Sequence, residues 1–113
     1  MDPASRLAAV STKNGRIGVI ATNATVKTGA YERAIAKYNE DATVFMEACP
    51  LLVPLVENGR FRPGDPVIEI VLKEYLEPLV EKNIDTLVLG CTHYPLLQEA
   101  ITHLYPSLNV ISS

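Results

Sequence analysis

Residues 85–97, Asp85-Thr-Leu-Val-Leu-Gly-Cys-Thr-His-Tyr-Pro-Leu-Leu97, hold the most concentrated set of reactive side chains in this sequence. The apolar run 86–89 is typical of a buried strand, Gly90 ends it, and Pro95 suits the first position of a helix. Open parallel sheets repeat this strand–turn–helix unit and build their sites at the carboxyl ends of strands. The stretch therefore predicts an α/β fold with Cys91 at the edge of the sheet where sites form.

The rest of the chain alternates between predicted strands and predicted helices. Apolar runs predict three further strands, over residues 16–21, 42–48 and 108–111. Periodic apolar residues predict helices over residues 3–10, about 25–38, 67–82 and 95–104, and residues 51–56 form either a short helix or an irregular segment. This alternation predicts a three-layer α/β sandwich with a mostly parallel sheet of about four strands, joined by right-handed crossovers.

Two of the predicted helices contain residues that disturb a helix. Gly29 weakens the start of the second helix, so its cap lies either within residues 22–25 or at Thr28. Pro78 lies inside the helix 67–82 and should kink or split it, because proline lacks the N–H that continues the helical hydrogen bonds.

Composition and charge narrow the class of protein. The 113 residues suffice for one domain with one core, and the net charge of −3, without a lysine or arginine cluster, argues against nucleic-acid binding. No apolar run approaches the roughly 18 residues that span a bilayer, and the N-terminus lacks the pattern of a secretion signal. The two cysteines, Cys49 and Cys91, match no zinc or CxxC spacing. We therefore expect a cytoplasmic protein with reduced thiols, no metal and no membrane partner.

Cys91 is the strongest candidate for a functional residue. A lone cysteine is more often a buried apolar residue, but this one precedes Thr92 and His93 near a helix start, which favours a thiolate. Residues two apart on an extended segment point the same way, so His93 could exchange protons with the thiol. Thr92 could donate its hydroxyl or backbone N–H to a carboxylate. The alternative is a histidine that only satisfies local hydrogen bonds in a tight turn.

The other chemically active side chains are weaker candidates. Glu57 lies beside Asn58-Gly59, and on the residues alone it is typical of a solvated loop. Cys49 follows a predicted strand as Cys91 does, but the apolar residues after it bring no polar partner, so we expect it to pack in the core. His103 lies near the end of the last helix, where a positive charge is favourable, and is interpreted as a cap.

Three stretches of the chain resemble the bacterial glutamate racemases of the aspartate/glutamate racemase superfamily. They are Leu89–Leu97 with its Gly-Cys-Thr-His-Tyr-Pro string, Ile17–Thr25 with Thr28–Tyr31 after it, and Ala48–Glu57. The resemblance implies a cofactor-independent isomerase that interconverts L- and D-glutamate, the D form being used in peptidoglycan synthesis. These enzymes place two cysteines on opposite faces of the substrate: one thiolate removes the α-proton, and the other thiol supplies a proton.

The resemblance also implies roles for individual residues. Cys91 is then one of the two catalytic cysteines, His93 assists the thiol on its side, and Thr92 together with His93 contacts the substrate. Glu57 matches a glutamate near that histidine in the family, which makes it a third candidate catalytic residue. Cys49 matches a structural position, and no metal or cofactor is implied.

Several family features have no counterpart in this chain. The first cysteine, in an Ala-Cys-Asn-Thr motif, its partner aspartate, the Tyr-Gly substrate contact and the helices after the last strand are missing. The family fold has two α/β domains that face each other across the site, and residues 1–113 resemble the second, which is inserted into the first. We therefore expect a fragment that carries half of the site, with glutamate as substrate and the missing first domain as partner, and that is inactive alone.

Two other functions fit the residues. A non-catalytic interaction module would self-associate through the apolar wall that a half-site exposes, which would make the chain a homo-oligomer. A cysteine-nucleophile enzyme could use Cys91 and His93 for acyl transfer, but no third group that would orient the histidine is evident in the sequence.

Overall fold

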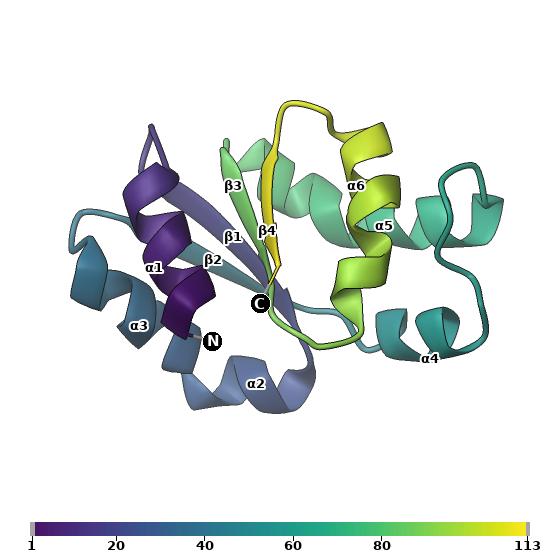
Figure 1. The fold of residues 1–113 in the computed structure, drawn as a ribbon, viewed down its shortest axis with the longest axis horizontal. Coiled ribbons are helices and arrows are strands. Elements are labelled where there is room, and N and C mark those ends of the chain that lie inside the picture. The colour runs from purple at the N-terminus through teal and green to yellow at the C-terminus, as the bar shows by residue number, and fades with distance from the viewer. Residues whose placement is uncertain (1, 113) are drawn as a thin grey trace.

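Four short strands form one parallel sheet in the computed structural model, which describes residues 2–112 (Figure 1). They are β1 (Arg16–Ala21), β2 (Thr43–Ala48), β3 (Thr86–Leu89) and β4 (Asn109–Ser112). The sheet has the order β2-β1-β3-β4, and every neighbouring pair is parallel. The two central strands, β1 and β3, are buried along nearly their whole length, as expected for parallel strands covered on both faces. The predicted fold class is confirmed.

The helices cover both faces of the sheet and make two cores. The helices and the one 3₁₀ segment are α1 (Asp2–Ser11), α2 (Asn23–Thr28), α3 (Ala30–Tyr38), α4 (Leu52–Glu57), α5 (Pro66–Glu81), the 3₁₀ helix η1 (Tyr94–Leu97) and α6 (Gln98–Leu104). Side chains alternate along the strands, so Ile17 and Val19 face α1 and α3, whereas Ile20 faces α4, α5 and α6. The connection from β1 to β2 runs in one direction along the sheet, and the connections from β2 to β3 and from β3 to β4 run in the other. Crossovers of the same hand that run in opposite directions lie on opposite faces of a sheet, as these helices do.

The segment predicted as one helix over residues 25–38 is two helices. Gly29 adopts a left-handed conformation (φ 67°) and ends α2 while it precedes α3. Thr22 caps α2, since its hydroxyl accepts from the Thr25 N–H at 3.5 Å. The cap residue of α3 is Gly29, and the hydroxyl of Thr28 before it accepts from the Ala30 N–H at 3.2 Å. The prediction of a single helix was wrong because a glycine with positive φ ends one helix before the next begins, rather than weakening one turn.

The helix predicted over residues 67–82 forms as α5, and Pro78 does not split it. The start of this helix is capped, since the Asp65 side chain accepts from the Val67 N–H at 3.0 Å and Pro66 occupies the first helical position. Four buried apolar residues, Ile68, Leu72, Leu76 and Leu79, hold one side of the helix against the core. The packing of this face outweighs the hydrogen bond that proline removes.

Near the carboxyl edge of the sheet, the short-helix alternative for residues 51–56 is the correct one. Residues 52–57 are helical, so Glu57 is the last residue of α4 rather than part of a solvated loop. The helix predicted from Pro95 begins as the 3₁₀ segment η1 and becomes α-helical only at Gln98. His103 lies in the last turn of α6 as predicted, with its Nε2 atom 3.9 Å from Oε2 of Glu69 on α5.

Candidate functional site

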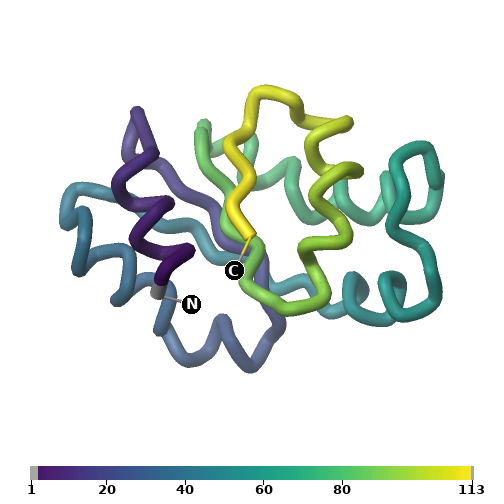
Figure 2. The backbone as a smooth tube through the Cα atoms, viewed as in Figure 1, coloured from purple at the N-terminus to yellow at the C-terminus, as the bar shows by residue number. Residues whose placement is uncertain are grey.

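The strand order defines where on the sheet a site is expected. The chain runs from β1 outward to β2, then back past β1 to β3 and on to β4, so its direction reverses between β1 and β3. In open α/β sheets ligands bind outside the carboxyl ends of the strands at such a switch point. Cys91 follows β3 after one intervening residue, which places it at this edge. The backbone trace in Figure 2 shows the turn after β3 at the same end of the molecule as the end of β4.

Gly90 determines how the chain leaves β3. Its N–H donates to the carbonyl of Ile20 at 2.8 Å, which extends the pairing with β1 by one residue. A Cβ atom at this position would lie 2.8 Å from that carbonyl oxygen and 3.2 Å from the ring of Tyr31. Only glycine therefore allows this close approach of the two backbones, and Cys91 emerges from the sheet immediately after it.

Cys91 and His93 lie in a tight turn. The Tyr94 N–H donates to the Cys91 carbonyl at 3.0 Å. The segment is therefore a turn, and the prediction of an extended segment was wrong. The two side chains nevertheless meet, with Sγ of Cys91 3.9 Å from Nδ1 of His93. Cys91 is partly exposed, and Thr92 lies exposed beside it. Cys91 is therefore not sealed in the core, and its thiol has an imidazole within reach for proton exchange.

Glu57 completes a line of three side chains. Its Oε2 atom lies 3.3 Å from Nε2 of His93, with 59% of the Glu57 side chain and 38% of the His93 side chain exposed. An ionised carboxylate only accepts hydrogen bonds, so Nε2 must carry the proton that it shares with Glu57. In a neutral imidazole Nδ1 is then the acceptor, and it faces the Cys91 thiol. The third group that would orient the histidine, which was not evident from the sequence, is thus Glu57.

Cys49, the other cysteine, has a different environment. It is fully buried, and its Sγ atom lies 3.6 Å from the carbonyl oxygen of Glu47. Burial, with a smaller contribution from the charge of Glu47, raises the pKa of the Cys49 thiol to about 12. The prediction that Cys49 packs in the core is confirmed, and its thiol stays protonated at neutral pH.

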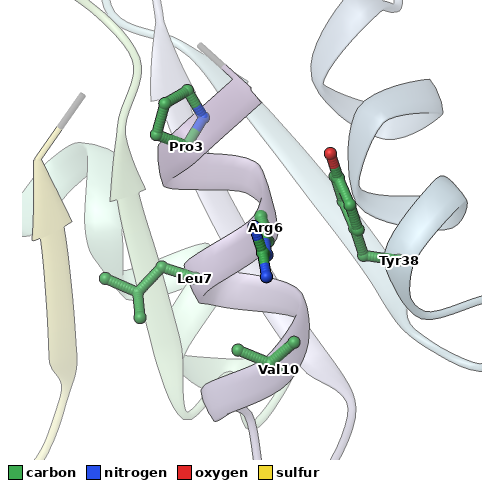
Figure 3. A pocket seen from close by; sticks show the side chains of 5 residues that line it. All are labelled: Pro3, Arg6, Leu7, Val10 and Tyr38. Carbon is green, nitrogen blue, oxygen red and sulfur yellow. The ribbon is translucent and has the colours of Figure 1, made fainter.

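Hollows on the surface lie both beside these residues, where Pro95 and Leu96 help to line one of them, and away from them. One, of about 380 Å³, lies between α1 and α3 and is lined by Pro3, Arg6, Leu7, Val10 and Tyr38 (Figure 3). Its lining is mostly apolar and contains neither a thiol nor an imidazole. Within residues 2–112, no three His, Cys, Asp or Glu side chains gather where they could hold a metal ion. In the same range, no helix has the length and apolar character to cross a membrane.

The fold and this edge of the sheet define a class: a parallel α/β protein with a thiol, an imidazole and a carboxylate in line at the switch point. The sequence pattern of the Asp/Glu/Hydantoin racemase family matches residues 2–113, and the chain belongs to this family. The family resemblance predicted from the sequence is thereby confirmed.

Several relatives of this chain are glutamate racemases. The glutamate racemase of Persephonella marina is 53% identical over 111 residues, which cover 98% of this chain and 42% of that protein. The crystal structure of glutamate racemase isoform RacE1 from Bacillus anthracis matches with a TM-score of 0.85 and 40% identity over 98% of this chain and 41% of its own. The crystal structure of a Francisella tularensis glutamate racemase in complex with D-glutamate matches with a TM-score of 0.79 and 36% sequence identity. The match covers 96% of this chain and 40% of that one. The chain thus spans about two fifths of the length of these relatives.

Proposed function

We propose that this chain supplies one half of a glutamate racemase active site, with Cys91 as one of two thiols that exchange the α-proton of glutamate. The observation that supports this most directly is the partly exposed Cys91 thiol, 3.9 Å from Nδ1 of His93, in a chain whose relatives are glutamate racemases. In this proposal Thr92 and His93 contact the substrate, and Glu57 holds the imidazole. Residues 1–113 correspond to the second of two domains, in a cytoplasmic enzyme that provides D-glutamate for peptidoglycan.

The chemistry follows from the three side chains. The thiol proton of Cys91 passes to Nδ1 of His93, and the imidazolium that forms is stabilised by the carboxylate of Glu57. The thiolate then takes the α-proton of glutamate, and the bond electrons remain on the α-carbon as a carbanion. A second thiol on the opposite face donates its proton to that carbon, which inverts the centre. In the reverse direction Cys91 is the donor.

The second thiol must come from outside these residues. Cys49 is the only other cysteine, and it is fully buried with its proton firmly held. Two large apolar side chains, Leu51 at the start of α4 and Leu96 in η1, are 53% and 54% exposed on the two segments that carry Glu57 and Cys91. Such side chains suit a surface that another domain covers. The part of the relatives that this chain does not span is the proposed source of the opposing thiol.

A chimera tests the proposal. Residues 1–113 would replace the matching segment of the Persephonella marina glutamate racemase, and D-glutamate would be followed in deuterated water by circular dichroism and by loss of the α-proton NMR signal. We expect the chimera to racemise glutamate, its Cys91→Ala variant to lose at least about a thousandfold in kcat, and its Cys49→Ala variant to keep activity. A folded chimera whose Cys91→Ala variant turns over like its parent contradicts the proposal, as does racemisation by the isolated 113 residues.

Acyl transfer is a second candidate, because Glu57 supplies the orienting group that such a mechanism needs. The relatives favour racemisation, and the two functions differ in a simple measurement. We expect p-nitrophenyl acetate to acylate Cys91 at most once per molecule, without turnover. Sustained release of p-nitrophenol that is lost in Cys91→Ala would favour the acyl-transfer mechanism instead.

A further inference from the structure

The position of α4 decides whether Glu57 meets His93. This helix has only six residues, which is too short to be stable alone, so its place depends on tertiary contacts. Leu52 and Val56, one turn apart, are buried in the same core as Tyr94. The helix therefore lies directly against the segment that carries Cys91 and His93.

Two tyrosine hydroxyls hold the start of α4. The Leu51 N–H donates to the hydroxyl of Tyr75 on α5 at 3.2 Å. The hydroxyl of Tyr94 donates to the carbonyl of Cys49 at 3.4 Å. Tyr94 has no exposed surface, so its hydroxyl needs a partner inside the protein. Burial also raises the pKa of Tyr94, which keeps this hydroxyl protonated as a donor.

Tyr94 directly follows His93, so the two ends of α4 are joined to one short segment. At the start of the helix the joint is the bond from Tyr94 to the Cys49 carbonyl, and at its end it is the pair of Glu57 and His93. We propose that Tyr94 is a positioning residue: through the Cys49 carbonyl it sets where α4 lies and thereby holds Glu57 against His93. This inference rests on the proposed role of His93 and Glu57 in activating Cys91.

The test measures the reactivity of Cys91 on the 113-residue chain, without substrate. Alkylation by iodoacetamide at pH 7 would be followed by mass spectrometry of the Cys91 peptide. We expect Tyr94→Phe to slow alkylation of Cys91 roughly three- to tenfold, because a displaced Glu57 no longer stabilises the imidazolium beside the thiolate. Tyr105→Phe, which removes a buried hydroxyl remote from α4, is the control and should change the rate less than about twofold.

A double variant separates positioning from a general loss of stability. If Tyr94 acts through Glu57, the Tyr94→Phe/Glu57→Ala double variant should alkylate no more slowly than Glu57→Ala alone. The nitrogen-15 NMR shifts of His93 should also show loss of the Nε2–H form in both single variants. Labelling of the buried Cys49 in the same samples reports unfolding. The inference is overturned if the slowing in the double variant equals the product of the slowing in the two single variants. It is also overturned if Tyr94→Phe has the same alkylation rate and His93 spectrum as the parent.

Tyr75→Phe is the second variant should Tyr94→Phe fail to fold. It removes the other hydroxyl anchor at the start of α4 and should shift the His93 spectrum in the same direction, whereas an unchanged spectrum counts against positioning through this loop. The chimera distinguishes the two proposals. If Cys91 reactivity responds as described but the chimera does not racemise glutamate, the proposed function fails and the positioning role of Tyr94 stands. If the chimera racemises glutamate but Cys91 reactivity does not respond, only the positioning role of Tyr94 is rejected.

Discussion

The Nε2 atom of His93 lies 3.3 Å from Oε2 of Glu57, although the two residues are 36 positions apart and belong to different segments at the carboxyl edge of the sheet. Neither residue is buried, so the pair depends on the packing of the segments that carry them rather than on a closed pocket. This relationship links the short helix α4 to the turn that presents Cys91.

Replacing Glu57 in the racemase chimera tests the pair directly. Glu57→Gln should lower kcat by about tenfold with little change in KM, because an amide stabilises the His93 imidazolium less than a carboxylate does. Steady-state kinetics by circular dichroism would measure both constants. Glu69→Gln, which removes the carboxylate beside the other histidine, His103, is the control; equal losses in both variants would show that the effect is not specific to His93.

The close approach at Gly90 predicts a large loss of stability on substitution. Gly90→Ala should lower the free energy of unfolding by about 2–3 kcal/mol, because the new Cβ meets the backbone oxygen of Ile20 at 2.8 Å. Gly18→Ala is a matched control in β1, where the 2.8 Å contact is with the end of the Ile84 side chain, which can move. Urea unfolding measures both, and a Gly18→Ala loss as large as that of Gly90→Ala would refute this explanation.

The two thiols should react very differently. With a pKa of about 12, only about one part in 10⁴ of Cys49 is ionised at pH 8, and the side chain is also fully buried. Iodoacetamide at pH 8 should therefore modify Cys91 alone in the folded chain and both cysteines in urea. Peptide mass spectrometry identifies the sites, and rapid modification of Cys49 under native conditions would contradict the structure.

Asp85 makes the stability of the chain depend on pH. Partial burial pulls its pKa upward, but hydrogen bonds from the Thr12 hydroxyl, the Asn14 and Lys13 N–H groups and the Thr86 hydroxyl together outweigh burial and hold the pKa below its usual value. A carboxyl group with a lowered pKa in the folded state stabilises the protein above its unfolded pKa of about 3.9, and this contribution is lost as the pH falls through the folded value.

The substitution Asp85→Asn should therefore lower the melting temperature at pH 7, and this loss should shrink as the pH falls and the Asp85 carboxyl becomes protonated. Thermal unfolding at several pH values measures this difference. A destabilisation that does not shrink at all as the pH is lowered into the acid range would show that the charge of Asp85 does not contribute.

The exposed apolar side chains beside the site predict self-association of the isolated chain. Leu51 and Leu96, both more than half exposed, should cause concentration-dependent association, and Leu96→Ser should reduce it. Light scattering over a range of protein concentrations measures the effect. A parent chain that stays monomeric at high concentration would remove the support for an interaction surface at this edge.

Much of the fold could be predicted from the sequence because parallel strands buried on both faces must be continuous apolar runs. The strands β1 and β3 satisfy this requirement and were placed correctly. The errors fell at Gly29, which ends a helix, and at Pro95, where the first turn of the helix is 3₁₀. Pro78 does not split α5. Local preference alone does not decide among these outcomes, because the surrounding packing contributes energies of similar size.

The sequence by itself determined the fold class, the family and the place of Cys91 after a buried strand, since each of these depends on residues that are neighbours in the chain. Only the tertiary structure decided that Glu57 ends a helix beside His93 and that Tyr94 bonds to the Cys49 carbonyl. These contacts join segments more than 30 positions apart. They exist because the sheet order places the ends of β2 and β3 on either side of β1, which no local pattern encodes.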